Sequence, residues 1–541
     1  MARTWLARSA ALLLLCAVAV MGGPGRVAFA HASLDASTPS ANSVLETGPP
    51  QIVLDFDEAI EADLTSIALF DGDGRAVDVG KPVAGADSTV VRSDVPALAD
   101  GIYAVVWRVT SADGHVVDGA FSFQVGTATT GSGQALIDQV RAGVRADPAV
   151  RWAYGVARYL SLVGAIVLIG AAWWLLQFPA AALGRRGPRR LIMVAWASLV
   201  SGSVAAFGLF GAEAVAGSLV DAVRPSVWGD VATTHTGRML LLRAALAVVL
   251  GALLVLRRSR AQGWWRGAGF TAAVFLLYTF PASGHPNSLQ PSAVWIAVDL
   301  AHLGAITVWI GGLAALAVVG AATLATPEGT GVARRFSLAA SICVPVIVAT
   351  GVAQALQLAG GLDDITSTDW GRLLLTKLTI VVVLLAVAGV SRWLLRHDGA
   401  VSMRRTVIAE ALLGLVVIGI TAGMVTLPPE PAVAARPFAV DLSVGGVIAI
   451  ISIGPGSVGG NEVHITMTPP GGSITPVVSA SARVSLPDQG IPSSPVTLVR
   501  EGNNHYSGQV TFPRSGDWTF EVIVQLTDTD TVLLATTVPI P

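Results

Sequence analysis

The chain has 541 residues, of which 53% are hydrophobic and 13% charged, and its mean hydropathy is +0.65. This composition excludes a disordered chain and an ordinary water-soluble enzyme, because part of the chain must lie in lipid. The net charge is −2 and the chain has only two lysines, Lys81 and Lys377, so it lacks the basic patch that nucleic acid requires. Two cysteines, Cys16 and Cys343, are too few for a disulfide framework or a cysteine-based metal site. Any bound metal is therefore expected on nitrogen and oxygen ligands.

Residues 1–30 have the pattern of a secretory signal peptide. Arg3 and Arg8 precede an apolar run, and Ala28-Phe29-Ala30 is a small-x-small cleavage pattern. Cleavage after Ala30 would make His31 the first residue of the mature chain. The free amine and Nδ1 of one histidine can close a chelate ring on a single ion, and Cu(II) suits such a nitrogen set best.

Residues 31–125 are expected to fold as a small all-β sandwich outside the membrane. Short β-forming runs, such as 51–57 and 103–109, are separated by Gly, Pro, Asp and Ser turns. Asp113 and His115 are two residues apart and would share one face of an extended segment. Together with His31 they offer three nitrogen donors and one oxygen donor. The alternative is a turn in which Asp113 caps its own backbone.

Three stretches of this domain resemble the CopC family of periplasmic copper-binding proteins. They are His31-Ala-Ser-Leu, Pro39-Ser-Ala-Asn-Ser and Ser111-Ala-Asp-Gly-His-Val-Val-Asp-Gly-Ala-Phe-Ser-Phe. The resemblance implies that His31, Asp113 and His115 are ligands of Cu(II). Some members of the family also have a methionine-rich Cu(I) site. Because residues 31–125 contain no methionine, only a Cu(II) site is expected.

After a linker at 126–151, residues 152–427 are expected to form an all-α bundle with about eight apolar spans, each long enough to cross the ~30 Å of hydrocarbon in a bilayer. Arginines concentrate in alternate loops, fourteen against three, which places those loops in the cytoplasm and both chain ends outside the inner or plasma membrane. The expected spans are 153–178, 191–213, 239–256, 267–283, 293–319, 336–358, 373–391 and 406–427. The cytoplasmic arginines are Arg185, Arg186, Arg189, Arg190, Arg257, Arg258, Arg260, Arg266, Arg334, Arg335, Arg392, Arg396, Arg404 and Arg405, and the opposite loops hold Arg224, Arg238 and Arg372.

Ionisable residues in membrane spans are costly and are candidates for function. Asp299 and His302 are three residues apart on the fifth span and share one face. His235 opens the third span, and His285 follows the fourth. With Asp369 before the seventh span, these residues are expected to form a membrane copper path. The alternative is that His302 only bonds Asp299 or a helix carbonyl, while the two edge histidines are interfacial polar residues.

The bundle also has a hint of internal duplication. Gly237-Arg-Met-Leu-Leu-Leu-Arg243 and Gly371-Arg-Leu-Leu-Leu-Thr-Lys377 each begin a helix, four helices apart, and each follows a candidate ligand, His235 or Asp369, by two residues. This spacing suggests a parallel repeat of four plus four helices. Arg243 and Lys377 could balance Glu213, Asp299 or a bound anion.

Much of the membrane region resembles the CopD copper-resistance membrane domain. The similar stretches are Arg335-Phe-Ser-Leu, Thr350-Gly351 and Thr368-Asp-Trp-Gly-Arg-Leu-Leu-Leu-Thr-Lys-Leu378. The Asp299 to Gly312 helix and the Arg404-Arg405…Glu410 segment also look like that family. The family is associated with passage of copper across the inner membrane, which implies a path through the bundle.

A proline-rich linker at 428–436 precedes residues 437–541, where β-forming runs alternate with Gly, Pro and Asn turns. We expect a second small sandwich outside the membrane, which weakly resembles YtkA-like domains. His464 and Met467 are three residues apart and would point to opposite faces of a strand, which disfavours a metal site there.

The sequence therefore predicts a copper-binding membrane protein that captures Cu(II) outside the cell membrane and imports copper for homeostasis and resistance, rather than an enzyme. Expected partners are copper ions, the lipid membrane and an extracytoplasmic copper chaperone or reductase. One alternative is an electron-transfer membrane protein that holds haem, although only His302 lies clearly inside a span. Others are a tethered copper buffer or sensor without transport, and an oxidative enzyme using the His31 chelate.

Overall fold

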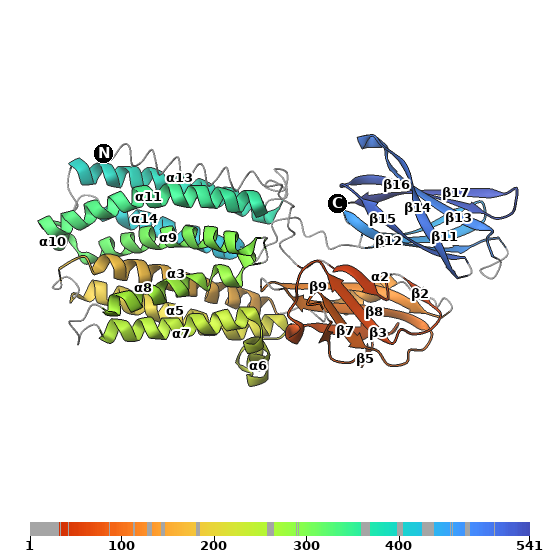
Figure 1. Ribbon diagram of the computed structural model, residues 1–541, viewed down its shortest axis with the longest axis horizontal. Helices are drawn as coiled ribbons and strands as arrows, with labels where there is room; N and C mark the ends of the chain where they lie inside the picture. Colours follow the sequence, from red (N-terminus) through yellow and green to blue (C-terminus); the bar gives the residue numbers. More distant parts are fainter. Residues whose placement is uncertain are drawn as a thin grey trace. The chain divides into compact units, whose positions relative to one another are not determined.

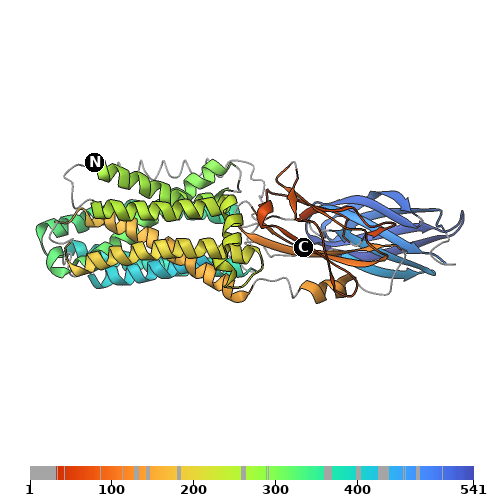
Figure 2. The same cartoon turned by 90° about the horizontal axis from the view of Figure 1, so that it is seen from below.

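The computed structural model describes residues 32, 34–41, 43–85, 87–111, 114–126, 133–141, 147–179, 184–256, 264–287, 289, 291–358, 368–397, 404–424, 438–454, 456, 458–470, 476–502 and 504–540 (Figures 1 and 2). These residues fall into two compact units. One contains the helical region Ala146–Pro431 together with Ser111–Val116, and the other contains the β domains. The expected fold class, a multi-domain membrane protein with a helical region between two β domains, is confirmed. The expected signal peptide lies outside the described residues.

The N-terminal β domain is a sandwich of two sheets, with strand orders β1-β3-β7-β6 and β2-β9-β8-β4-β5. Alternating side chains from both sheets, among them Ile52, Leu54, Trp107 and Phe123, form its core. The strands are β1 Leu34–Thr38, β2 Val44–Leu45, β3 Gln51–Phe56, β4 Ser66–Phe70, β5 Ala76–Val77, β6 Val83–Ala84, β7 Val90–Asp94, β8 Gly101–Thr110 and β9 Val116–Val125.

The segment that carries His115 is a tight connection between β8 and β9, not an extended strand. The Ser111 N–H donates to the His115 carbonyl at 2.8 Å, and the Gly114 N–H donates to the Ser111 carbonyl at 2.9 Å. Gly114 has φ +83°, a backbone conformation that glycine adopts without strain. The argument that Asp113 and His115 share a strand face therefore does not apply, and Asp113 itself lies outside the described residues.

The structure differs from the expected linker at 126–151, because α2 (Gly133–Arg141) lies inside it. Leu136, Ile137 and Val140 fall on one face of this helix and are buried against Ala104 and Val106 of β8. An apolar face at helical spacing folds onto a sheet rather than staying in solvent. The β domain thus extends past its last strand.

The membrane region contains eight helices of 15 to 32 residues within its described ranges (Figure 1). Seven of them are long and apolar enough to cross a membrane. The helices are α3 Pro148–Leu175, α5 Arg186–Ala214, α7 His235–Leu256, α8 Trp264–Tyr278, α9 Ser292–Val319, α11 Pro327–Leu358, α13 Asp369–His397 and α14 Arg404–Met424, with short α6 Pro225–Thr233 and α10 Ala321–Leu324 beside them.

The expected fourth span, 267–283, corresponds to α8, which ends five residues earlier, at Tyr278. Its 15 residues rise about 22 Å, less than the ~30 Å hydrocarbon core. The helix ends here because Pro281 has no backbone N–H with which to continue it. The Thr279 hydroxyl donates to the Leu276 carbonyl at 2.6 Å. The chain continues as two short 3-10 turns, η4 Pro281–Ser283 and η5 His285–Asn287. We name residues 279–287 the strap.

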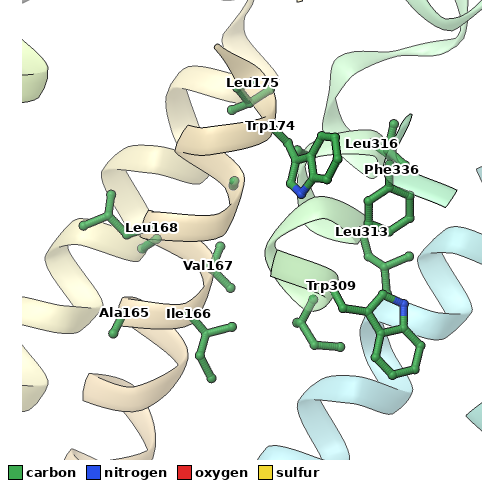
Figure 3. Packing of buried hydrophobic residues seen from close by; sticks show 14 of the residues in the cluster. Ala165, Ile166, Val167, Leu168, Trp174, Leu175, Trp309, Leu313, Leu316 and Phe336 are labelled. Carbon is green, nitrogen blue, oxygen red and sulfur yellow. The ribbon is translucent and has the colours of Figure 1, made fainter. Parts of the chain in front are cut away.

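The eight helices divide in chain order into a first set, α3, α5, α7 and α8, and a second set, α9, α11, α13 and α14. The corresponding first pairs and last pairs pack in both sets. α3 packs on α5, and α9 on α11. α7 packs on α8, and α13 on α14. The two sets meet where α3 crosses α9, with Gly170 against Gly311. A Cβ added at Gly170 would lie on the Thr307 carbonyl. Near this crossing, the Trp174 indole donates to the Val308 carbonyl at 2.9 Å and meets the Phe336 ring edge-on (Figure 3).

The suggested internal duplication is reflected in the local structure of two helix starts. At α7 the Thr234 hydroxyl accepts from the Gly237 N–H at 3.0 Å, and at α13 the Thr368 hydroxyl accepts from the Gly371 N–H at 3.0 Å. Both threonines are buried. Such caps satisfy backbone donors that have no partner in the first turn of a helix.

α11 contains a proline, Pro345, in its interior. Before it, Phe336 and Cys343 pack in the bundle core. After it, the helix continues through Thr350 and Gln354. A proline inside a helix removes one backbone hydrogen bond, so the two parts of α11 are less firmly joined there.

The C-terminal domain is one antiparallel sheet of eight strands, ordered β10-β11-β12-β15-β14-β13-β16-β17. Its outermost strands β10 and β17 lie close together, so the sheet curls into a near-barrel around its own core, rather than the expected sandwich. Several strands, such as β16 and β17, largely alternate buried and less buried residues, so that one face of the sheet is apolar and encloses the core. The strands are β10 Phe438–Val444, β11 Val447–Gly454, β12 Gly459–Thr468, β13 Ser479–Leu486, β14 Ile491–Gly502, β15 His505–Phe512, β16 Gly516–Gln525 and β17 Thr531–Ile540.

Candidate metal site

His302 of α9 contacts α11 through one of its ring nitrogens. Its Nδ1 lies 2.8 Å from the Thr350 hydroxyl oxygen. That hydroxyl donates its own hydrogen to the Val346 carbonyl at 2.6 Å, so it accepts from His302. With the hydroxyl hydrogen on that carbonyl, Nδ1 is the donor to Thr350, and Nε2 is the nitrogen left for a metal ion. A metal-binding histidine is normally oriented in this way, by a hydrogen bond from its other nitrogen.

Gly351 of α11 leaves space for the His302 ring because it has no side chain. A Cβ added to Gly351 would lie 3.3 Å from His302 Cε1, closer than side chains usually approach. Thr350 and Gly351 thus act together: the first holds one ring nitrogen, and the second leaves space beside the ring. Both belong to the stretch that suggested the CopD resemblance.

Asp299 lies one helical turn before His302 and is held by the same neighbouring helix. Gln354 donates its side-chain amide to Asp299 Oδ1 at 2.8 Å. This bond occupies one carboxylate oxygen and leaves Oδ2 as a donor to a cation. The alternative in which His302 only bonds Asp299 does not describe this geometry, because each has its own partner on α11.

His235 and Arg243 of α7 hold the strap in place. The His235 Nε2 lies 2.8 Å from the Ala282 carbonyl, to which it donates, so this nitrogen is not free for copper. The Arg243 guanidinium, only 4% exposed, donates to the Thr279 hydroxyl at 2.9 Å, the Thr279 carbonyl at 2.8 Å and the Ser283 hydroxyl at 3.1 Å. It also lies 3.7 Å from the centroid of the Phe280 ring. His235 is therefore a strap-holding residue in this arrangement.

His285 of the strap stacks on His115. The two ring centroids are 4.4 Å apart and the rings are parallel to within 2°. His115 belongs to Ser111–Val116, the segment that clusters with the helical unit. The nitrogen lone pairs of stacked rings lie in parallel planes, so one ion cannot lie in both planes at once. The stack suits successive contact with an ion rather than simultaneous chelation.

Of the remaining predicted site residues, only Asp369 lies among the described residues, and it pairs with a neighbour on its own helix. Asp369 is an exposed residue of the α13 start, with a side chain 78% accessible, and it pairs with Arg372 at 3.2 Å. His31 and Asp113 lie outside the described residues. Within the described part of the chain, no three His, Cys, Asp or Glu side chains are placed to hold one metal ion. The expected convergence of three histidines and an aspartate is thus not seen.

Sequence reasoning missed the polar partners on α11 and one histidine. Thr350 and Gln354 looked like ordinary polar residues of an apolar helix. In the C-terminal domain, His464 Nδ1 lies 3.3 Å from His505 Nε2, and Glu462 lies 3.5 Å from His464 Nε2. His464 lies outside the core that contains Met467, as expected for opposite faces. The contact with His505 depends on strand pairing that the local spacing does not show.

Three family models match separate parts of this chain. The CopC domain matches residues 34–126, the copper resistance protein D-like N-terminal domain matches 147–291, and copper resistance protein D matches 330–424. The chain joins a CopC domain to a CopD domain. Both CopD-type models are described as copper resistance protein D or as similar to it. Helix α9, with Asp299 and His302, lies between the matched ranges of the two CopD-type models.

Two relatives and two solved structures are similar to parts of the chain. Copper transport protein CutJ of Bacillus subtilis (strain 168) is 27% identical over 464 residues, 82% of this chain and 83% of the relative. Protein YobA of Escherichia coli (strain K12) is 29% identical over 100 residues, 18% of this chain and 80% of YobA. The crystal structure of CopC from Methylosinus trichosporium OB3b, 32% identical, covers 19% of this chain and 100% of that chain with a TM-score of 0.17. PcoC, a methionine-rich copper resistance protein from Escherichia coli, is 29% identical and covers 18% of this chain and 98% of that chain with a TM-score of 0.16.

Proposed function

We propose that this protein captures Cu(II) outside the membrane through its CopC domain and passes copper inward through the CopD bundle. In this proposal residues 31–125 are the capture domain, with His31, Asp113 and His115 as ligands, and residues 152–427 contain the path. Both β domains lie on the extracytoplasmic side. The protein acts as a transporter rather than an enzyme and serves copper homeostasis and resistance.

The observation that carries the proposal is the pair of open donor atoms on α9. Thr350 contacts His302 Nδ1 and Gln354 donates to Asp299 Oδ1, so His302 Nε2 and Asp299 Oδ2 are the atoms proposed to meet the ion. Both lie inside an apolar helix long enough to cross a membrane. Two donors bind a metal ion weakly compared with a complete site. Weak binding suits a path, because an ion that is conducted must also leave.

The transfer from the capture domain is supported by the parallel rings of His115 and His285. An ion released by His115 meets His285 after a short rotation of either ring. Linking a capture site to a path in one chain raises the local concentration of the ion at the entrance. An extracytoplasmic copper chaperone would load the capture site, and a reductase would supply Cu(I) where the path requires it. CutJ, whose name describes a copper transport protein, is consistent with this assignment.

Copper accumulation in cells tests the proposal. Cells that express the intact chain should contain more copper than cells without it, as measured by mass spectrometry of washed cells. His302→Ala should abolish the increase, and His31→Ala should reduce it mainly at low external copper. His397→Ala is the matched control, because His397 is an exposed histidine that bonds only the Trp393 carbonyl of its own helix.

Undiminished accumulation with His302→Ala would contradict the path. If none of the variants alters cellular copper, the bundle is not a copper path, and the protein is better regarded as a tethered copper buffer or sensor. A Soret band in the absorbance of the purified protein would instead indicate the haem alternative.

A further inference from the structure

Glu410 of α14 is an acid inside the bundle that the copper path does not use. It is only 2% exposed and belongs to the buried stripe of its helix, with Val407, Gly414 and Ile418 at helical spacing. At Gly414, one turn further on, an added Cβ would lie 2.5 Å from the Ile310 side chain of α9. An apolar side chain would fill such a place at no electrostatic cost, so a carboxyl group there calls for a reason.

The surroundings of Glu410 hold no counter-charge for it. Among the described residues it forms no ion pair within 4.0 Å, and its hydrogen bond is with a neutral hydroxyl. The cations nearest in sequence are directed elsewhere, since Arg392 donates to two oxygens of α11 and Arg404 donates to a carbonyl of α9. α9 and α3 also pack on α14, and they have no ionisable side chain in 303–319 and 160–175. The other ionisable residues in the last two turns of α13 and the first turn of α14 are exposed, namely Arg396, His397 and Arg405. This environment favours the neutral acid over the carboxylate.

The Ser391 hydroxyl of α13 joins Glu410 to the arginine-rich end of the bundle, where α14 begins. It contacts Glu410 Oε1 and lies 2.6 Å from the Thr406 hydroxyl oxygen. Ser391 and Glu410 are buried, whereas Thr406, the third residue of α14, is half-buried. A serine hydroxyl has one hydrogen, so its two contacts need a second hydrogen from one of the neighbours.

Two arrangements satisfy this chain of three groups. In the first, a protonated Glu410 donates to Ser391, and Ser391 donates to Thr406. In the second, Thr406 donates to Ser391, and Ser391 donates to a Glu410 carboxylate. The two differ by one proton, which each hydroxyl passes on by releasing one hydrogen and accepting another.

We propose that Glu410 is a proton-binding site of the bundle, and that it exchanges its proton with water at the arginine-rich end through Ser391 and Thr406. In the proposed topology this end faces the cytoplasm, so the ligand is a proton from that side. No heavy atom has to leave its place when the proton moves, and the charge of Glu410 changes by one. The site stands on these contacts alone and does not depend on the proposed copper path.

Infrared spectroscopy of the full chain in lipid nanodiscs, prepared without metal, tests the binding of the proton. A protonated carboxylic acid has a carbonyl stretch that is separate from the bands of carboxylates and amides. At neutral pH, Glu410→Gln should remove one such band from the spectrum. Glu328→Gln is the matched control and should leave the band unchanged, because Glu328 is an exposed acid in the first turn of α11.

The route of the proton is tested by the rate at which this band shifts after transfer of the protein into heavy water. Ser391→Ala interrupts the chain and should slow the shift at least about tenfold, because hydrogen bonds of the relay are lost. Ser391→Thr keeps a hydroxyl and should exchange within about threefold of the parent chain. Ser201→Ala should exchange at the parent rate, because that hydroxyl bonds only carbonyls of its own helix among the described residues. If Ser391→Ala does not fold, Thr406→Val takes its place, with the same expected slowing.

Each result decides between a proton site and a merely structural acid. A spectrum that Glu410→Gln does not alter overturns the proposal, because Glu410 would then be ionised. Parent-like exchange in Ser391→Ala, or in Thr406→Val where that variant replaces it, overturns it as well. Loss of the band in Glu410→Gln together with slow exchange in the interrupted chain supports it. Copper is absent from both measurements, so the copper path and the proton site can fail separately.

Discussion

Thr234 and Thr368 begin α7 and α13 with the same capping bond to a glycine three residues on, and Arg243 or Lys377 follows at the same distance. In the first set of helices that cation is buried and bound to the strap. In the second set Lys377 is half-buried, and among the described residues it forms no hydrogen bond and no ion pair within 4.0 Å. The same helix start thus precedes a cation that is bonded to the strap in one set and a cation without such bonds in the other. The comparison teaches that a repeated motif can preserve the position of a cation while its neighbours decide what the cation does.

The largest effect is expected where the two sets of helices meet. Gly170→Val places a branched side chain on the Thr307 carbonyl and on Gly311, where no space exists. The helices must separate, and the free energy of unfolding should fall by at least about 3 kcal/mol. Denaturant unfolding of the full chain in detergent measures this. Gly155→Ala in the same helix, where an added Cβ meets nothing within 4 Å, is the control and should change stability by less than about 1 kcal/mol. Equal stability of Gly170→Val and the control would show that the two sets are not joined at this crossing.

Replacing each cation by the residue type of the other should show how far each depends on its bonds. Arg243→Lys keeps the charge but cannot reproduce the bonds of the guanidinium to Thr279 and Ser283, so it should cost about 2 kcal/mol of stability. Lys377→Arg has no such bonds to lose and should stay within about 0.5 kcal/mol of the parent chain. Thermal unfolding of both variants provides the measurement. Similar losses in the two variants would mean that the cations are equivalent after all.

The smallest effect is expected at the shared caps. Thr234→Ala and Thr368→Ala each remove one side-chain acceptor from a helix start, which should cost about 1 kcal/mol in each case. The two losses should agree within about 0.5 kcal/mol, because both threonines are buried and make bonds of equal length. The serine variants should recover most of the stability. A large inequality between the alanine variants would break the structural match between α7 and α13.

Much of the architecture follows from local pattern. The apolar spans, the β runs and the shared face of Asp299 and His302 depend on residues close in sequence, and the structure has them. The expectations failed at three places, where single residues or an apolar helix face determined the local structure. The segment before β9 was expected to be extended, but Gly114 allows a tight connection there. Part of the expected linker forms α2, because one apolar face of that helix, with Leu136, Ile137 and Val140, packs on β8. Pro281 ended α8 earlier than expected.

The partners of the candidate site could not be predicted in the same way. Thr350 and Gln354 are 48 and 55 residues from the side chains they bond. Only the packing of α9 on α11 brings them together, and no spacing within one helix indicates it. The stacking of His115 on His285 joins residues still further apart. Asp299 and His302 as metal ligands therefore stay a prediction from the sequence, whereas the structure shows which of their atoms Gln354 and Thr350 contact.

Pro345 has a mechanical consequence for α11. Because it has no backbone N–H, the Ser341 carbonyl lacks its usual partner one turn on, and a bend is least costly at this turn. The part before the bend is locked by Phe336 and Cys343, while the part after it carries Thr350, Gly351 and Gln354. A swing of that upper part would move one wall of the site and leave the packed half in place. The hydrogen bonds of Thr350 and Gln354 to His302 and Asp299 would then break and re-form without disturbing the packed core.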